Sequence, residues 1–227
     1  MKDTAPLLRR TVAACLVICA AITVASIALM PEFAGDHTDR LAAIAADGTT
    51  AGASAALFAL AQLPFAVGLL GVAHLLRSRT PVLAILAGTL CALGGFGHAV
   101  YGGQSLVMLE MARDPQHYDA YARVLGGVES GWGIPFMAMG LLGTVLGIVL
   151  TAVALWRAGL GPRWLPPLLA AFVVVEFGLA GLSVWASYGA SLLYAAGLLA
   201  MGQLVSRSPL ARWGGAEAPA PVLPARA

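Results

Sequence analysis

Glu176 is the one acidic residue that lies deep inside a long apolar stretch of the chain. It comes 11 residues after Leu165, so in a helix that rises about 1.5 Å per residue it lies about 17 Å inside. That depth is close to the middle of a hydrocarbon layer about 30 Å thick. A carboxylate at this depth is costly and usually faces a bundle interior or a wet cavity, often in a functional site. We therefore predict that Glu176 binds a ligand. The alternative is a protonated carboxyl group that bonds to a neighbouring helix.

Four further polar side chains are expected in the same outer half of the membrane: His98, Gln62, Ser183 and Ser191. Together with Glu176 they predict a polar cavity that opens to the outside. In an enzyme, Glu176 would act as the general acid and His98 as the base. The alternative is that each group bonds locally, because serine often holds membrane helices together. No second buried carboxylate supports acid–base chemistry, so we rank an enzyme below a binding or transport protein.

Two His-x-Asp pairs lie in segments expected outside the membrane, His37 with Asp39 and His117 with Asp119. Residues of these types could share a metal ion. Solvated loop residues and helix caps are the interpretation we favour, and we predict no metal site.

Sequence motifs for familiar cofactors and nucleophiles do not occur. The chain has no G-x-x-x-x-G-K-[ST], H-E-x-x-H, C-x-x-C or G-x-S-x-G sequence. This disfavours an ATPase, a zinc protease of that class and a serine hydrolase of the elbow type. Haem would need two histidines at similar depth, whereas His74 and His98 are expected at opposite ends of their helices. We predict no cofactor.

Composition indicates which elements must position these groups. Hydrophobic residues make up 59% of the 227 residues, charged residues 11%, and the mean hydropathy is +0.85. A soluble domain has roughly 45–50% apolar and about 25% charged residues, so a soluble globular protein and a disordered chain are both excluded. The 13 basic and 11 acidic residues nearly cancel, which argues against a nucleic-acid partner. The composition predicts an α-helical protein whose partner is the lipid bilayer.

Six stretches are long and apolar enough to cross a bilayer, which takes about 20 residues. They cover about residues 11–30, 55–76, 81–101, 134–156, 165–187 and 188–205. We therefore predict an all-α fold with a six-helix transmembrane domain over residues 1–205. The segment 206–227 is rich in Pro, Ala and Gly and has no apolar period, which predicts a disordered cytoplasmic tail.

The basic residues predict the orientation of this bundle. With the N-terminus in the cytoplasm, 10 of the 13 basic residues lie on the cytoplasmic side, as the positive-inside rule requires. Eight of the 11 acidic residues then lie outside. We predict a multi-pass protein of the plasma membrane with both termini in the cytoplasm.

The first of two longer outer loops carries the pattern of a short amphipathic helix. Thr38 can cap a turn that has Leu41 and Ile44 on one face and that ends at Gly48. We expect this helix to lie on the outer membrane surface.

The second outer loop carries a similar pattern. Pro115 opens a helix with Tyr118, Tyr121 and Leu125 on one face, and the glycines at 126–127 end it. It is also expected on the outer surface.

An offset of 80 residues relates the two loops. Residues 37–39 match residues 117–119, and Arg77 matches Arg157 after the next predicted helix. A duplicated unit would consist of an outer amphipathic helix, a spanning helix and an inner arginine. Chance similarity in an alanine-rich chain is the alternative.

Gly143 and Gly147 form a G-x-x-x-G pattern on the fourth predicted span, and Gly140 extends the small face. Such a face lets two helices approach closely. We expect it to serve packing inside the bundle first and a homodimer second.

Four short stretches give the chain a family resemblance. They are DRLAAIAA at 39–46, GVAHLLR at 71–77, ALWRA at 154–158 and PRW at 162–164. In these stretches the chain resembles uncharacterised six-helix integral membrane proteins of the domain-of-unknown-function type that are common in high-GC bacteria. The resemblance implies the topology and carries no reaction, substrate or catalytic residue.

The sequence thus predicts an integral membrane protein that binds or transports a small or lipophilic ligand through an outward-facing polar cavity near Glu176. The alternatives are a membrane-embedded enzyme that acts on a lipid or isoprenoid substrate and a non-catalytic accessory subunit.

Overall fold

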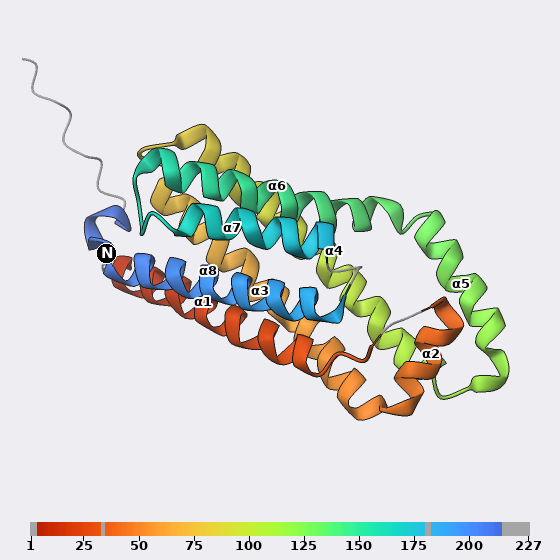
Figure 1. Ribbon diagram of the computed structural model, residues 1–227. Helices are drawn as coiled ribbons and strands as arrows, with labels where there is room; N and C mark the ends of the chain where they lie inside the picture. Colours follow the sequence, from red (N-terminus) through yellow and green to blue (C-terminus); the bar gives the residue numbers. More distant parts are fainter. Residues whose placement is uncertain (1–3, 33–34, 180–182, 215–227) are drawn as a thin grey trace, which may run out of the picture.

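The computed structural model describes residues 4–32, 35–179 and 183–214, and every regular element in these ranges is helical (Figure 1). The longer elements are α1 (Ala5–Ala28), α2 (His37–Ala46), α3 (Gly48–Leu76), α4 (Pro81–Met111), α5 (Tyr118–Ser130), α6 (Ile134–Ala158), α7 (Leu165–Val174) and α8 (Val184–Arg207). Turns of 3₁₀ helix cover Pro115–His117 and Leu210–Arg212, and a π-helical segment, Val175–Leu179, continues α7.

Five of these helices, α1, α3, α4, α6 and α8, are long and apolar enough to cross a membrane. Side chains such as Leu63, Val82 and Ile85 are 67–72% exposed on the outside of the bundle, which suits a surface covered by lipid. The buried core lies between the helices and includes Leu16, Leu69, Leu155, Leu198 and Met201. The chain is therefore an all-helical bundle of membrane type.

The predicted fifth span, 165–187, differs from the structure. The ten residues of α7 and the five of the π-helical segment rise only about 22 Å, less than the roughly 30 Å of a hydrocarbon layer. Residues 180–182, which belong to the predicted span, lie outside the described residues. Ser183 then has an extended backbone and its hydroxyl accepts a hydrogen bond from the Trp185 amide, so that α8 begins at Val184 instead of residue 188.

Glycine brings α4 and α6 into backbone contact. A methyl group added at Gly143 would lie 2.6 Å from the Gly94 nitrogen, and one added at Gly147 would lie 2.6 Å from the sulfur of Cys91. The G-x-x-x-G face is thus covered by α4 of the same chain. A homodimer through Gly143 and Gly147 stays a prediction.

Both described ends of the chain lie at one end of the bundle, which we call the terminal end (Figure 1). There the Arg9 guanidinium of α1 donates a hydrogen bond of 2.8 Å to the Ser208 carbonyl. The short α7 runs back between α6 and α8, so it reverses the chain as a full span would.

The segment predicted as a disordered tail begins with ordered structure. Helix α8 continues to Arg207, and Trp213 is 4% exposed. Its indole nitrogen donates to the Ser208 hydroxyl at 2.7 Å, and its ring stacks on His74 with 5.3 Å between ring centres. The indole needs both an apolar surface and an acceptor, and this corner supplies them. Residues 215–227 lie outside the described part.

Helices α2 and α5 pack on each other at the opposite end, which we call the cap end (Figure 1). Leu41 and Ile44 of α2 and Leu125 of α5 are buried there with Met108 of α4, so the predicted apolar faces turn toward each other and toward the ends of α3 and α4. Whether the 80-residue offset that relates the two helices reflects a duplication stays a prediction.

The boundaries of the cap helices differ from those predicted. Asp36 caps α2 in place of Thr38, because its carboxylate accepts hydrogen bonds from the amides of Thr38 at 2.8 Å and Asp39 at 3.1 Å. Gly48 begins α3 instead of ending α2, and α5 continues past the glycines at 126–127 to Ser130.

Candidate functional site

Two adjoining cavities lie in the half of the bundle nearest the cap end. The large cavity, of about 300 Å³, is walled by α1, α2, α3 and α4, by Glu176 of the π-helical segment and by the start of α8. The small cavity, of about 120 Å³, lies deeper, among α1, α3, α4, α6, α7 and α8. Ser26, Ile27, Phe58 and Glu176 line both. Of these two cavities, the large one reaches the lower end of the size range of ligand pockets, roughly 300–1,000 Å³. A third, more open hollow of about 430 Å³ lies apart from them, between α6 and α7, and none of the predicted site residues lines it.

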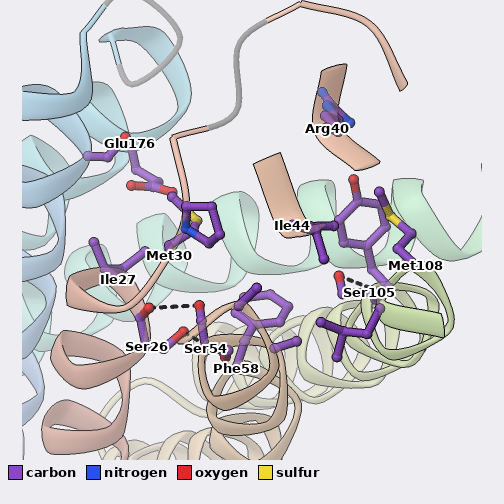
Figure 2. Close-up of a pocket in the computed structure, with 16 residues that line it drawn as sticks. Ser26, Ile27, Met30, Arg40, Ile44, Ser54, Phe58, Ser105, Met108 and Glu176 are labelled. Carbon is purple, nitrogen blue, oxygen red and sulfur yellow. Dashed lines mark hydrogen bonds between the residues drawn. The ribbon is translucent and has the colours of Figure 1, made fainter. Parts of the chain in front are cut away.

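Glu176 lies in the π-helical segment where α7 loses its regular turn. Such single-turn π segments occur frequently at functional sites, because the wider turn redirects side chains. The side chain is half-buried, and its carboxylate has no hydrogen bond or ion pair within the described part of the chain. Figure 2 shows it on one wall of the large cavity. The predicted alternative, a carboxyl group bonded to a neighbouring helix, is therefore not seen among the described residues.

Three of the other predicted site residues line the small cavity together with Glu176, namely His98, Gln62 and Ser191. Gln62 donates to the Phe58 carbonyl of its own helix at 2.8 Å, and Ser191 donates to the Tyr188 carbonyl at 2.8 Å. These two groups thus also make the local bonds that were the alternative.

His98 makes no hydrogen bond within the described residues and meets the Phe58 ring edge-on, with 5.7 Å between ring centres. Its ring nitrogens are therefore open to a group in the small cavity.

Ser183 does not belong to the site. It is exposed at the start of α8, lines neither cavity, and uses its hydroxyl to cap the helix. The prediction placed it by depth on a helix that was assumed to continue to residue 187. Because that helix ends early, the residue moves to a connection.

Several lining residues were not predicted, among them Thr144 and Arg40. Thr144 of α6 lines the small cavity, and its buried hydroxyl has no hydrogen-bond partner. Arg40 of α2 lines the large cavity. In the sequence, Thr144 lies within a glycine-rich packing face and Arg40 lies in an outer loop between acidic and apolar residues, so neither stands out.

Three serines on the remaining wall of the large cavity have partners within the chain. The Ser54 hydroxyl donates to the Ser26 carbonyl at 2.8 Å, and the Ser26 hydroxyl donates to the Ser54 carbonyl at 3.3 Å. These two bonds join α1 to α3 (Figure 2). Ser105 likewise donates to the Tyr101 carbonyl.

The histidines of the two His-x-Asp pairs have separate partners. His37 lies 3.4 Å from the Glu129 carboxylate and links α2 to α5. His117 lies 2.7 Å from the Asp114 carboxylate, and that hydrogen bond holds the pKa of Asp114 below its ordinary value. No three His, Cys, Asp or Glu side chains gather as metal ligands within the described ranges.

Comparisons with protein-family models, with curated proteins and with solved structures find no match for the chain.

Proposed function

We propose that the chain is an integral membrane protein that binds a small or lipophilic ligand in the two cavities, through a hydrogen-bond donor or cationic group of the ligand at Glu176. The observation that carries this proposal is the position of Glu176. Its half-buried carboxylate faces both cavities and has no partner within the described residues. A buried polar group without a partner costs free energy, and a ligand that donates to the carboxylate removes that cost.

We propose that the chain crosses the plasma membrane in six segments, and that α7 with its π-helical continuation is the fifth. Both termini then lie in the cytoplasm. The reversal of the chain at α7 supports an even number of segments. The basic residues supply the orientation, because most of those in the described ranges lie at the terminal end (Figure 1). The cavities then lie in the outer half of the bilayer, as the outward-facing site requires.

Transport is the use of the site that the interrupted α7 favours. Transporters often bind their substrates near the middle of the membrane, where discontinuous helices expose polar backbone groups. Here the α-helical pattern ends at Val174, and Glu176 is the second residue of the π-helical segment that follows.

An enzyme remains the second candidate, because Glu176 and His98 line the same small cavity. A general acid and a general base could both reach a substrate there. However, no residue in the described ranges fixes the His98 ring by a hydrogen bond, whereas catalytic histidines are usually oriented by such a bond. We therefore rank ligand binding first.

The test is the melting temperature of the full chain in one detergent with hexylamine as the probe and hexanol as its uncharged counterpart. We expect hexylamine, and not hexanol, to raise the melting temperature of the wild type. Glu176→Gln should fold normally and lose the hexylamine shift. Glu110→Gln is the matched control, because Glu110 lines neither cavity and is 68% exposed. A wild-type shift that survives Glu176→Gln, or the lack of any hexylamine shift in the wild type, would overturn the proposal.

A further inference from the structure

Arg40 gives the large cavity a second charged wall. Its side chain is partly buried, and its guanidinium forms no ion pair or hydrogen bond within the described part of the chain. The acidic residues nearest to it on α2 serve the backbone instead. Asp36 accepts from the amides that open the helix, and Asp39 accepts from the Asp36 amide. The guanidinium is therefore available to a molecule in the cavity.

Arg40 and Glu176 lie on different sides of the large cavity (Figure 2). They come from α2 and from the end of α7, which are far apart in the sequence. No ion pair joins them, so each charged group is open to a separate part of one bound molecule.

Most of the wall between these two charges is apolar. Ile27, Met30 and Ile44 lie there, as Figure 2 shows, and Phe58 and Met108 complete it. The hydroxyl groups of Ser26 and Ser54 are occupied by the bonds between α1 and α3, so they do not compete for a ligand. A molecule that spans the cavity thus meets a cationic group, an apolar surface and an acidic group in that order.

We propose that the ligand carries opposite charges at its two ends: a carboxylate or phosphate at Arg40, an amine at Glu176 and a short apolar body between them. This inference rests on the proposed function and adds the anionic end. Arginine matches carboxylate and phosphate with parallel hydrogen bonds. A ligand with only one charge leaves the other protein charge unmatched in a partly buried site, which lowers affinity.

The experiment uses linear probes with an amine at one end, a carboxylate at the other and increasing length: aminobutanoic, aminohexanoic and aminooctanoic acid. Each is compared with the amine and the carboxylic acid of the same length. We measure dissociation constants from the melting temperature of the full chain as a function of probe concentration. At the best length, the doubly charged probe should bind at least about tenfold more tightly than either singly charged one, as expected for a charge-assisted bond.

Arg40→Gln should remove this advantage and leave binding of the simple amine unchanged, whereas Glu176→Gln should remove binding of the amine. Arg113→Gln and Glu110→Gln are matched controls, because these two residues pair with each other on the surface at 2.9 Å and line neither cavity. They should behave as the wild type.

The outcomes separate the two proposals. If the amine binds through Glu176 and the carboxylate adds nothing at any length, the doubly charged ligand is overturned while the proposed function stands. An advantage that survives Arg40→Gln also overturns it. If no amine binds, both proposals fail.

Discussion

Polar side chains that pack at the terminal end of the bundle differ in their partners from those that line the cavities toward the cap end. At the terminal end, Arg9 bonds to Ser208, His74 lies between Arg77 and Arg212, and Trp213 is buried and hydrogen-bonded. The side chains of Arg9, His74, Arg77, Ser208 and Trp213 each have a hydrogen-bond partner there. Toward the cap end, the cavity-lining side chains of Arg40, Glu176, His98 and Thr144 have none among the described residues.

Pairing accounts for this contrast. A buried polar group that bonds to its partner stabilises a fold. A buried polar group without a partner lowers the stability, so its presence calls for a ligand or a water molecule that bonds to it. The hydrogen bonds at the terminal end therefore stabilise the fold. The cap end has the composition of a site whose remaining partners come from a ligand or from water.

The largest expected effect is the difference in thiol labelling between the two ends, because we place them on opposite sides of the membrane. A cysteine at Ser78, exposed at the terminal end, should be shielded from an impermeant thiol reagent in intact cells, and a cysteine at Gln116, exposed near α5, should be labelled. Permeabilised cells should label both. A background without Cys15, Cys19 and Cys91 removes the native signal. Labelling at Ser78 in intact cells would mean that the terminal end faces the outside and that the proposed orientation is wrong.

Trp213→Ala should cause the largest loss of stability, because it removes the side chain that packs and bonds at the terminal end. Truncation of a buried tryptophan typically costs about 3–5 kcal/mol, and here the Ser208 hydroxyl and the His74 ring also lose a partner. The measurement is the melting temperature in detergent. Trp132→Ala is the control, because Trp132 is 92% exposed, and it should change the stability by less than about 0.5 kcal/mol. Equal effects of the two changes would mean that the described corner is not a stabilising element.

Glu176→Leu should leave stability level or raise it, in contrast to Trp213→Ala, because it removes a polar group that has no partner. If the carboxyl group instead joined two helices, the substitution would cost up to about 1–2 kcal/mol. The melting temperatures of wild type, Glu176→Gln and Glu176→Leu decide this in one detergent at pH 7. A strongly destabilised Gln variant would point to an ionised Glu176 with a paired cation.

The smallest expected effect comes from the loss of the Asp36 cap, which should lower the local stability of α2, the helix that carries Arg40. The hydrogen bonds from Thr38 and from the Asp39 amide hold the pKa of Asp36 below its ordinary value. A carboxyl group whose pKa is lowered by folding stabilises the folded state above its unfolded pKa of about 3.9 and loses this contribution as the pH falls through the folded value. The protection factors of the α2 amides, which correct for the slower intrinsic exchange in acid, should therefore fall below about pH 4.

Asp36→Ala should speed the same exchange at neutral pH, and Asp36→Ser should restore protection because serine also caps helices. Exchange at the terminal end should stay unchanged in both variants. A uniform change along the whole chain would show that the two ends are not independent.

Much of the fold could be predicted from sequence because apolar runs and amphipathic faces are local signals. The predicted span 134–156 lies within α6, and Leu41, Ile44 and Leu125 face a buried cluster. The end of the fifth helix could not be predicted, because residues up to 187 are apolar whether or not they are helical. Ser183 was misplaced for the same reason.

The site was harder to predict, because its residues are distinguished by polar side chains that lack a partner in the fold, and the residue type does not reveal this. Glu176 stood out because a carboxylate is rare inside an apolar helix. Thr144 and Arg40 could not stand out, since an unpaired hydroxyl or guanidinium has the same letter as a paired one. Only the positions of α2 and α6 reveal which groups lack a bond.

The glycine contact between α4 and α6 has a mechanical consequence. Helices that interdigitate through leucine side chains can shear past each other by small rotamer changes. Backbone atoms in direct contact have no such freedom, so Gly94 and Gly143 fix α4 and α6 as one stiff unit. The interfaces of α1, α7 and α8 instead contain leucine side chains, among them Leu16, Leu169 and Leu198. We therefore expect any widening of the cavities to come from the side that carries Glu176 and not from the contact between α4 and α6.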